Sequence, residues 1–95
     1  SHKEEPIVLV IDPNHDYWPI PWYLRKIEKR GFYSKIPEGV EKVKILIISP
    51  QIQKEIDEKL PPNSYMVFTY SIRPSELRYL YVEKNLWEEF MKNRI

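Results

Sequence analysis

Two continuous apolar runs constrain the fold of this chain more than any other feature. They occupy residues 7–11 (Ile-Val-Leu-Val-Ile) and 44–48 (Lys-Ile-Leu-Ile-Ile), and most of their side chains are β-branched. Runs of this length and composition are typical of strands that are buried on both faces of a sheet. Neither run approaches the roughly 18 residues that a membrane-spanning helix needs. We therefore expect both runs to lie in the middle of one sheet.

The remaining patterns predict an alternation of strands and helices in the order β-α-β-β-α-β-β-α. Gly31 is expected to cap the end of the first helix, and Ser49 followed by Pro50 predicts the start of the second. Asn85 with Glu88 three residues later predicts the start of the last helix. The expected helices span about residues 20–30, 51–60 and 86–92, and the other expected strands span 32–36, 65–72 and 77–82, with a helix as the alternative for 77–82.

This order predicts an α/β fold with a three-layer, Rossmann-like or flavodoxin-like sheet. We expect the sheet to be mostly parallel, with strand order 2-1-3-4-5 and the fifth strand antiparallel at the far edge. Ligands of such sheets bind beyond the carboxyl ends of the central strands. Three segments are expected to meet there, namely residues 12–18, residues 49–51 and the turn at Arg73.

The composition excludes several classes of function. The 95 residues form one small domain, and 15 basic residues against 14 acidic ones leave a net charge of +1. Nucleic-acid-binding proteins need a clustered excess of basic residues, so no nucleic-acid partner is expected. The absence of cysteine excludes disulfides, thiolate zinc sites and a cysteine nucleophile. Ser1 and His2 resemble the remnant of a purification tag, so we assign the domain to residues 3–95 and expect it to be part of a larger protein.

The loop after the first strand lacks the chemistry of a nucleotide site. It contains no glycine, and the chain has neither a G-x-G-x-x-G nor a P-loop pattern. Pro19 and Pro21 also remove two backbone donors near the expected helix start, where a phosphate would need them. We therefore expect no bound cofactor.

Asp12, His15 and Asp16 are three ligand-type side chains within a short stretch. As a functional set they would hold a metal ion or act in acid–base catalysis. The structural interpretation is favoured, because Asp12 before Pro13 is ordinary turn chemistry and Asp16 can cap the following helix. Ser49 is likewise expected to act as a cap and not as a nucleophile. We expect no metal site and no catalytic residue in this chain.

Residues 16–25 are the most unusual stretch, because they contain two of the three tryptophans together with two prolines. Helical spacing predicts one inward stripe, made of Ile20, Tyr23, Leu24 and Ile27. Trp22 falls on the opposite side, among Arg25, Lys26 and Lys29. An outward tryptophan beside cations can stack on a sugar ring, lie in a membrane–water interface or dock a neighbouring domain. The structural alternative is that the last helix folds over Trp22.

The order of motifs resembles that of a known tail domain. The likeness spans about residues 6–94 and is carried by Tyr-Trp-Pro-Ile-Pro-Trp-Tyr-Leu-Arg at 17–25, Gly31-Phe32, Ile48-Ser49-Pro50, Tyr-Ser-Ile-Arg-Pro at 70–74, Tyr81-Val82 and Leu86-Trp87. The tail belongs to polytopic, mannosyltransferase-like membrane proteins of archaea and some bacteria. These proteins are similar to the dolichyl-phosphate-mannose-dependent protein mannosyltransferases, and some are described as flippase-associated. Ile20 and Lys26 depart from the family pattern, which often has Leu at the first position and an acidic or aromatic residue at the second.

The resemblance implies a non-catalytic accessory domain that follows a bundle of transmembrane helices and lies outside the cytoplasm. Catalysis in such transferases is ascribed to acidic residues in a loop between early membrane helices, and that loop is absent from this chain. The domain would be tethered to the membrane and would contact the transmembrane portion of its own parent chain. The resemblance also implies that it helps to hold the acceptor or a lipid-linked sugar.

These arguments select seven candidate binding residues, which are Asp16, Tyr17, Trp18, Trp22, Arg25, Ser49 and Arg73. Two alternatives remain open. The first is a free-standing small-molecule-binding domain or enzyme with a site at the carboxyl ends of the first and third strands, built from Asp12, His15, Asp16, Ser49 and Arg73. The second is a purely structural interaction module, in which Trp18 and Trp22 are buried against this domain's own helices or a neighbour.

Overall fold

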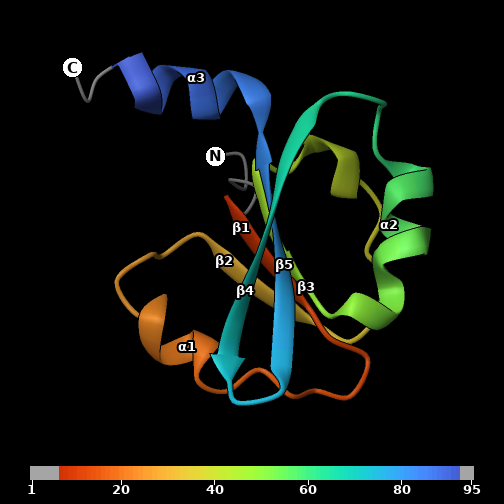
Figure 1. The fold of residues 1–95 in the computed structure, drawn as a ribbon, viewed down its shortest axis with the longest axis vertical. Coiled ribbons are helices and arrows are strands. Elements are labelled where there is room, and N and C mark those ends of the chain that lie inside the picture. Colours follow the sequence, from red (N-terminus) through yellow and green to blue (C-terminus); the bar gives the residue numbers. More distant parts are fainter. Residues whose placement is uncertain (1–6, 93–95) are drawn as a thin grey trace, which may run out of the picture.

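The computed structural model describes residues 7–92 as a five-stranded sheet with short helices beside it (Figure 1). The strands are β1 (Val8–Ile11), β2 (Arg30–Tyr33), β3 (Ile45–Ile48), β4 (Tyr65–Arg73) and β5 (Glu76–Glu83). The α-helices are α1 (Ile20–Tyr23), α2 (Gln53–Lys59) and α3 (Lys84–Lys92), and the 3-10 turns are η1 (Val40–Lys42) and η2 (Pro50–Ile52). The suspected tag residues Ser1 and His2 lie outside the described residues.

The two apolar runs form the neighbouring strands β1 and β3, which confirms their prediction as buried strands. They pair in parallel, from Val8 opposite Ile45 to Ile11 opposite Ile48. All four side chains of β1 and three of the four in β3 are buried. Each aliphatic side chain buried in this way contributes about 1.5–3 kcal/mol to folding, so these strands anchor the sheet.

The predicted fold class is wrong. The strand order is β2-β1-β3-β5-β4, so β5 lies next to β3 and β4 forms the far edge. The pairs β1–β2 and β1–β3 are parallel, whereas β3–β5 and β4–β5 are antiparallel. The described residues therefore form a mixed sheet, and not a mostly parallel Rossmann-like or flavodoxin-like sheet of order 2-1-3-4-5.

The β4–β5 hairpin accounts for this correction. Only Pro74 and Ser75 separate the two strands, and Ser75 has a φ of 65°, a left-handed turn conformation. Two strands joined by so short a connection pair with each other in antiparallel fashion. The hairpin docks on β3 through β5 because β5 carries the buried side chains Arg78, Tyr81 and Val82, whereas no side chain of β4 is buried.

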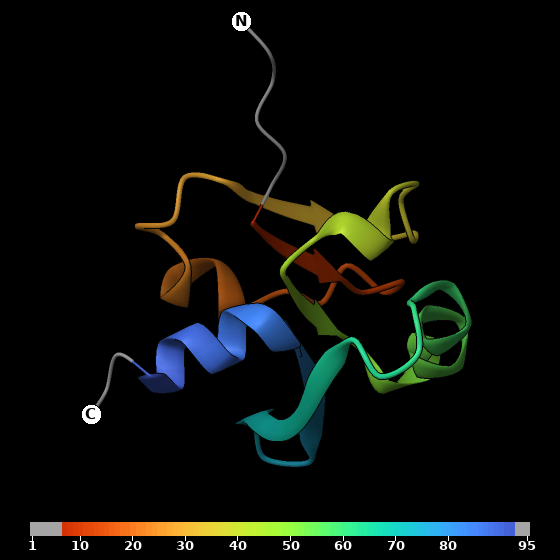
Figure 2. The ribbon, with the colours of Figure 1, turned by 90° about the horizontal axis from the view of Figure 1, so that it is seen from above.

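Helices lie on both faces of the sheet. Figure 2 shows α2 on one face and α1 with α3 on the other. Beneath α2, a core cluster combines Leu46 and Ile48 of β3 with Ile56 of α2. A smaller cluster on the opposite face joins Val10 of β1 to Ile20 of α1, and half-buried side chains surround it. The face that carries α1 and α3 is therefore the less completely covered one.

The predicted helix over residues 20–30 is wrong, because α1 ends at Tyr23 after one turn. Hydrogen-bonded turns follow it, and the amide of Ile27 donates to the carbonyl of Leu24 at 2.9 Å. Ile20 is buried, and Leu24 and Ile27 pack against the smaller core cluster as expected. Tyr23, however, is 66% exposed, because one turn of helix is too short to hold the whole predicted stripe against the sheet.

Strand β2 begins earlier than the predicted residues 32–36, and this also shortens the helix. Arg30 pairs with Val8, and Gly31 pairs with Leu9, so the backbone is already extended there. Gly31 is therefore a strand residue and not the predicted helix cap. A Cβ atom at Gly31 would lie 2.7 Å from the Tyr33 ring and 3.1 Å from the Leu9 side chain, so the close packing around this strand favours glycine.

Helix α3 confirms the helix predicted near the carboxyl end, but its start differs. The Glu83 carboxylate, and not Asn85, accepts a hydrogen bond from the backbone N–H of Leu86 at 3.1 Å. Trp87 packs against Phe68 of β4, with 5.1 Å between the ring centroids. The last helix thus packs near the far edge of the sheet, and Trp22 stays 52% exposed, so the predicted alternative in which this helix folds over Trp22 is wrong.

Tyr81 joins β5 to α2 through a partly buried hydrogen bond. Its ring is 2% exposed, and its hydroxyl donates to Oδ1 of Asp57 at 2.6 Å. Burial, and secondly the bond to Asp57, raises the pKa of Tyr81 from 10.0 to about 12. Both effects favour the protonated phenol in the folded state.

This pKa shift predicts a loss of stability at alkaline pH. Between about pH 10 and pH 12 the unfolded chain releases the Tyr81 proton while the folded chain keeps it, so the free energy of unfolding falls as pH rises. Urea unfolding at about pH 9 and about pH 11 should show a steeper loss for the wild type than for Tyr81→Phe. Parallel losses in the two proteins would contradict this assignment.

Candidate functional site

The loop that follows β1 is a compact turn built around Asp12. The carboxylate of Asp12 accepts a hydrogen bond from the backbone N–H of Asn14 at 2.9 Å, and its carbonyl accepts one from the backbone N–H of His15 at 3.0 Å. His15 adopts a left-handed conformation with a φ of 56°. The predicted turn chemistry of Asp12 is thus confirmed, and the side chain of Asp12 is aimed across the end of the sheet.

A buried ion pair joins this loop to the β4–β5 hairpin. Nη2 of Arg78 lies 2.9 Å from Oδ2 of Asp12, and the two side chains are only 5% and 3% exposed. Arg78 also donates to the carbonyl of Asp16 at 3.1 Å and to that of Leu77 at 2.7 Å. The guanidinium is therefore surrounded by acceptors, as a charge buried at this depth requires.

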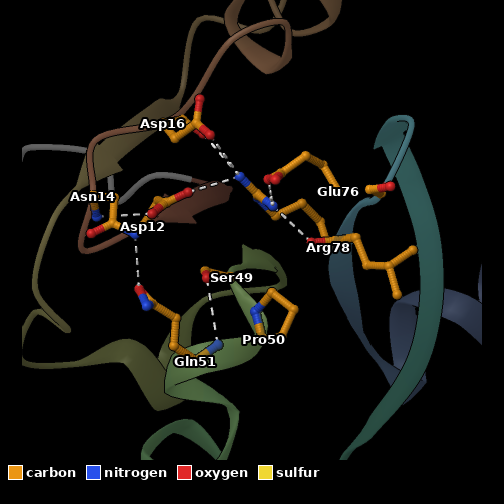
Figure 3. Close-up of a pocket in the computed structure, with 10 residues that line it drawn as sticks. Asp12, Asn14, Asp16, Ser49, Pro50, Gln51, Glu76 and Arg78 are labelled. Atoms are coloured by element: carbon orange, nitrogen blue, oxygen red, sulfur yellow. Dashed lines mark hydrogen bonds and ion pairs between the residues drawn. The ribbon is translucent and has the colours of Figure 1, made fainter.

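A second, more exposed ion pair lies beside the first. Nη2 of Arg73 lies 2.5 Å from Oδ2 of Asp16. Oε1 of Glu76 lies 3.5 Å from both Arg73 and Arg78, and Figure 3 shows Glu76 beside Arg78. The hydrogen bond from Arg73, with the charges of Arg73 and Arg78, lowers the pKa of Asp16. Asp16 thus stays ionised near neutral pH and is a poor proton donor. Because Asp16 binds Arg73, it does not cap α1, which has no side-chain cap.

Ser49 and Gln51 form the opposite side of the site. The hydroxyl of Ser49 accepts from the backbone N–H of Gln51 at 3.4 Å, and Pro50 is the first residue of η2. This arrangement confirms the predicted helix start. Oε1 of Gln51 accepts from Nδ2 of Asn14 at 3.3 Å, so a hydrogen bond crosses from η2 to the β1 loop.

Together these residues line an open pocket at the carboxyl ends of β1 and β3, which we call the strand-end pocket (Figure 3). It has a volume of about 370 Å³ and is lined by Asp12, Asn14, Asp16, Ser49, Pro50, Gln51, Ser75, Glu76, Leu77 and Arg78. A second hollow, of about 410 Å³, lies along the β2–β3 connection and is lined by Leu9, Tyr33, Pro37, Glu38, Gly39, Glu41, Lys42 and Val43. The strand-end pocket lies where the loops after β1 and β3 meet the β4–β5 turn, and most of its lining side chains are polar.

The three segments predicted to meet at the strand ends do meet there. Asp12, Asp16 and Ser49 line the pocket, and Arg73 binds Asp16 at its rim. Five predicted residues do not join them: Tyr17 packs against Phe32 at 5.3 Å between ring centroids, whereas His15, Trp18, Trp22 and Arg25 lie at the surface. His15 contacts only Tyr17 among the ring pairs of the described residues.

The start of β5 and the turn before it contribute lining residues that were not predicted from the sequence, namely Ser75, Glu76, Leu77 and Arg78, of which Glu76 and Arg78 are charged. Arg78 is the one basic side chain in the apolar strand that spans 77–82. A charge in the middle of such a strand is buried and needs an opposite charge nearby. Asp12, which directly follows the buried strand at residues 7–11, is an acidic residue that can supply it. This signal was present in the sequence, but it required knowing that β5 lies beside β3.

A second surface feature, which we call the α1 aromatic surface, consists of Trp18, Trp22 and Tyr23. These side chains are 61%, 52% and 66% exposed. The peptide bond between Trp18 and Pro19 is cis. Arg25 lies over the Trp22 ring, with Cζ 3.7 Å from the ring centroid, and its Nη1 donates to the Trp22 carbonyl at 2.8 Å. The predicted outward position of Trp22 beside Arg25 is therefore confirmed.

The described residues offer no preformed metal centre. No group of three or more His, Asp or Glu side chains within residues 7–92 is arranged to hold an ion. Asp12 and Asp16 each face an arginine instead.

No helix within residues 7–92 has the length and apolar character that crossing a bilayer requires. Comparisons of this chain with protein families, curated proteins and solved structures find no match.

The buried pair predicts a large stability loss when one partner is removed. Arg78→Met should lower the free energy of unfolding by about 3–5 kcal/mol, because Asp12 is left buried without its counter-charge. Urea unfolding provides the measurement, and Arg73→Met at the half-exposed pair is the matched control, with a much smaller expected loss. The double variant Asp12→Leu/Arg78→Met should recover part of the loss. Equal losses for Arg78→Met and Arg73→Met would contradict a special role for the buried pair.

Proposed function

We propose that this chain is a non-catalytic, extracytoplasmic accessory domain of a glycosyltransferase-like membrane protein. Within that domain, the strand-end pocket holds a sugar of the acceptor or of the lipid-linked donor. The observation that carries the proposal is the pairing of the pocket's ionic groups: Asp12 with Arg78 and Asp16 with Arg73. Groups that already neutralise each other are suited to binding a polar neutral ligand and poorly suited to proton transfer or nucleophilic attack.

The remaining lining supports a ligand rich in hydroxyl groups. Ser49, Ser75, Asn14 and Gln51 supply hydroxyl and amide groups that both donate and accept hydrogen bonds. Glu76 adds a half-exposed carboxylate, an acceptor of the kind that binds sugar hydroxyls. The volume of about 370 Å³ suits one sugar ring with part of a neighbour, at the lower end of the usual range for small-ligand sites.

The membrane parent is supported by the motif order, which resembles the tail domain of mannosyltransferase-like membrane proteins over about residues 6–94. In that setting the catalytic acids belong to a loop between membrane helices. The paired acids of this chain would then take no part in the reaction, and the pocket would position a sugar for a site elsewhere in the parent protein.

Sugar binding can be tested by nuclear magnetic resonance. Titration of the ¹⁵N-labelled chain with mannose and a short mannose oligosaccharide should shift the amides of Asn14, Ser49, Gln51 and Glu76, with millimolar affinity. Gln51→Ala should weaken binding several-fold because it removes the amide that faces the pocket. The control Asn85→Ala, in α3 at the other end of the sheet, should bind as the wild type does (Figure 1). No shifts at the highest sugar concentration, or equal binding by the two variants, would contradict the site.

The membrane part of the proposal has a separate test. The coding sequence that contains this segment should encode a long upstream stretch with several hydrophobic helices of about 20 residues each. A start codon immediately before Lys3 would contradict this part of the proposal. It would favour instead the alternative of a free-standing small-molecule-binding domain that uses the same pocket.

A further inference from the structure

The α1 aromatic surface is not explained by the strand-end pocket. Two of the three tryptophans of the chain belong to it, and Trp18, Trp22 and Tyr23 are each more than half exposed. Exposed aromatic side chains in one short segment mark a contact surface more often than a solvated one. Pro19 and Pro21 restrict the backbone of this segment, so little conformational entropy is lost when the side chains are bound.

The segment that carries this surface is rich in basic residues. Residues 22–30 contain four basic residues, Arg25, Lys26, Lys29 and Arg30, and a single acidic one, Glu28. None of the ion pairs among residues 7–92 involves Arg25, Lys26 or Arg30. This differs from the strand-end pocket, where each arginine has a carboxylate within 4 Å. The charges of Arg25 and Lys26 are therefore available to a partner.

This combination of side chains matches the chemistry of a membrane interface. Tryptophan and tyrosine concentrate at the level of the lipid headgroups, where an apolar ring and a polar edge are both accommodated. Arginine and lysine beside them reach anionic headgroups with their charges while their aliphatic stems stay on apolar surface. The position of Arg25 over the Trp22 ring, with its guanidinium bound to the Trp22 carbonyl, fits this arrangement.

We propose that the α1 aromatic surface, with Arg25 and Lys26, docks on the surface of a membrane that contains anionic lipid. A neutral sugar fits less well, because it would leave Arg25 and Lys26 without a counter-charge. A second copy of the chain also fits less well, because two positive surfaces would repel each other. The proposal goes beyond sugar binding in the pocket and does not depend on it.

Docking of this kind would bring the strand-end pocket close to the headgroups. In Figure 1, α1 lies at the same end of the molecule as the carboxyl ends of β1 and β3. Only Tyr17 separates Trp18 of the aromatic surface from Asp16 of the pocket. A ligand in the pocket would therefore lie next to the lipid surface on which the tryptophans rest.

Vesicle co-sedimentation tests the proposal with the chain as it stands. The wild type should sediment with vesicles of phosphatidylcholine and phosphatidylglycerol, and much less with phosphatidylcholine alone or at high salt. Arg25→Gln/Lys26→Gln should weaken the partition onto anionic vesicles about 30-fold, because each of the two basic residues removed contributes roughly fivefold to the attraction. Trp22→Ala should weaken it by roughly tenfold or more through loss of buried apolar area.

Matched controls separate this surface from charge in general. Lys54→Gln/Lys59→Gln removes the same charge from α2 on the opposite face of the sheet and should lower binding far less (Figure 2). Gln51→Ala should bind vesicles as the wild type does, so failure of the pocket proposal and failure of this one are distinguishable. Circular dichroism checks that each variant is folded.

Three outcomes would overturn the proposal. The first is no sedimentation of the wild type with anionic vesicles. The second is equal loss of binding in the α1 and α2 charge variants. The third is evidence for another occupant without lipid binding: self-association in analytical ultracentrifugation that Trp22→Ala abolishes, or amide shifts at Trp18 and Trp22 with mannose oligosaccharides.

Discussion

The ion pair between Asp12 and Arg78 joins the two parts of which the sheet is made. Asp12 ends β1, in the parallel part of the sheet, and Arg78 belongs to β5, in the antiparallel hairpin. Burying either charge alone would cost several kcal/mol, so each needs the other in one particular place. With β5 beside β3, Arg78 lies opposite the end of that strand and within reach of Asp12. The same guanidinium holds the carbonyl of Asp16, and so the loop that leads to α1.

The two surfaces at this end of the molecule differ in how their charges are used. In the strand-end pocket, acids and arginines are paired, and the groups left to a ligand are mostly hydroxyls and amides. On the α1 aromatic surface, Arg25 lies over the exposed Trp22 ring, and neither Arg25 nor the adjacent Lys26 takes part in an ion pair among the described residues. The first arrangement suits a polar neutral ligand, and the second suits an anionic interface. Both follow from short segments that leave the carboxyl end of the sheet.

Much of the fold could be predicted where local signals and burial agree. The runs that become β1 and β3 need two buried faces, and Ser49 with Pro50 starts η2 through a local hydrogen bond. The meeting of three segments at the strand ends followed from these elements. The helix expected over residues 20–30 ends after one turn, because the pairing of Arg30 and Gly31 with β1 competed with helical periodicity and prevailed. The prediction that Asp16 caps the first helix was wrong as well, because Asp16 binds Arg73, which is distant in sequence, instead of the helix start.

By itself, the sequence determined which segments are buried strands, where the second helix starts, and that tryptophans and cations gather in one short stretch. These properties depend on residues that are only a few positions apart in the sequence, so short sequence patterns are enough to predict them. Only the tertiary structure decided that β5 rather than β4 lies beside β3, that Arg78 pairs with Asp12, and that Trp22 stays uncovered by α3. A hairpin can dock through either of its strands. In this chain β5 docks on β3 because β5 carries the side chains that become buried, and among them is Arg78, whose charge is neutralised by Asp12 at the end of the sheet.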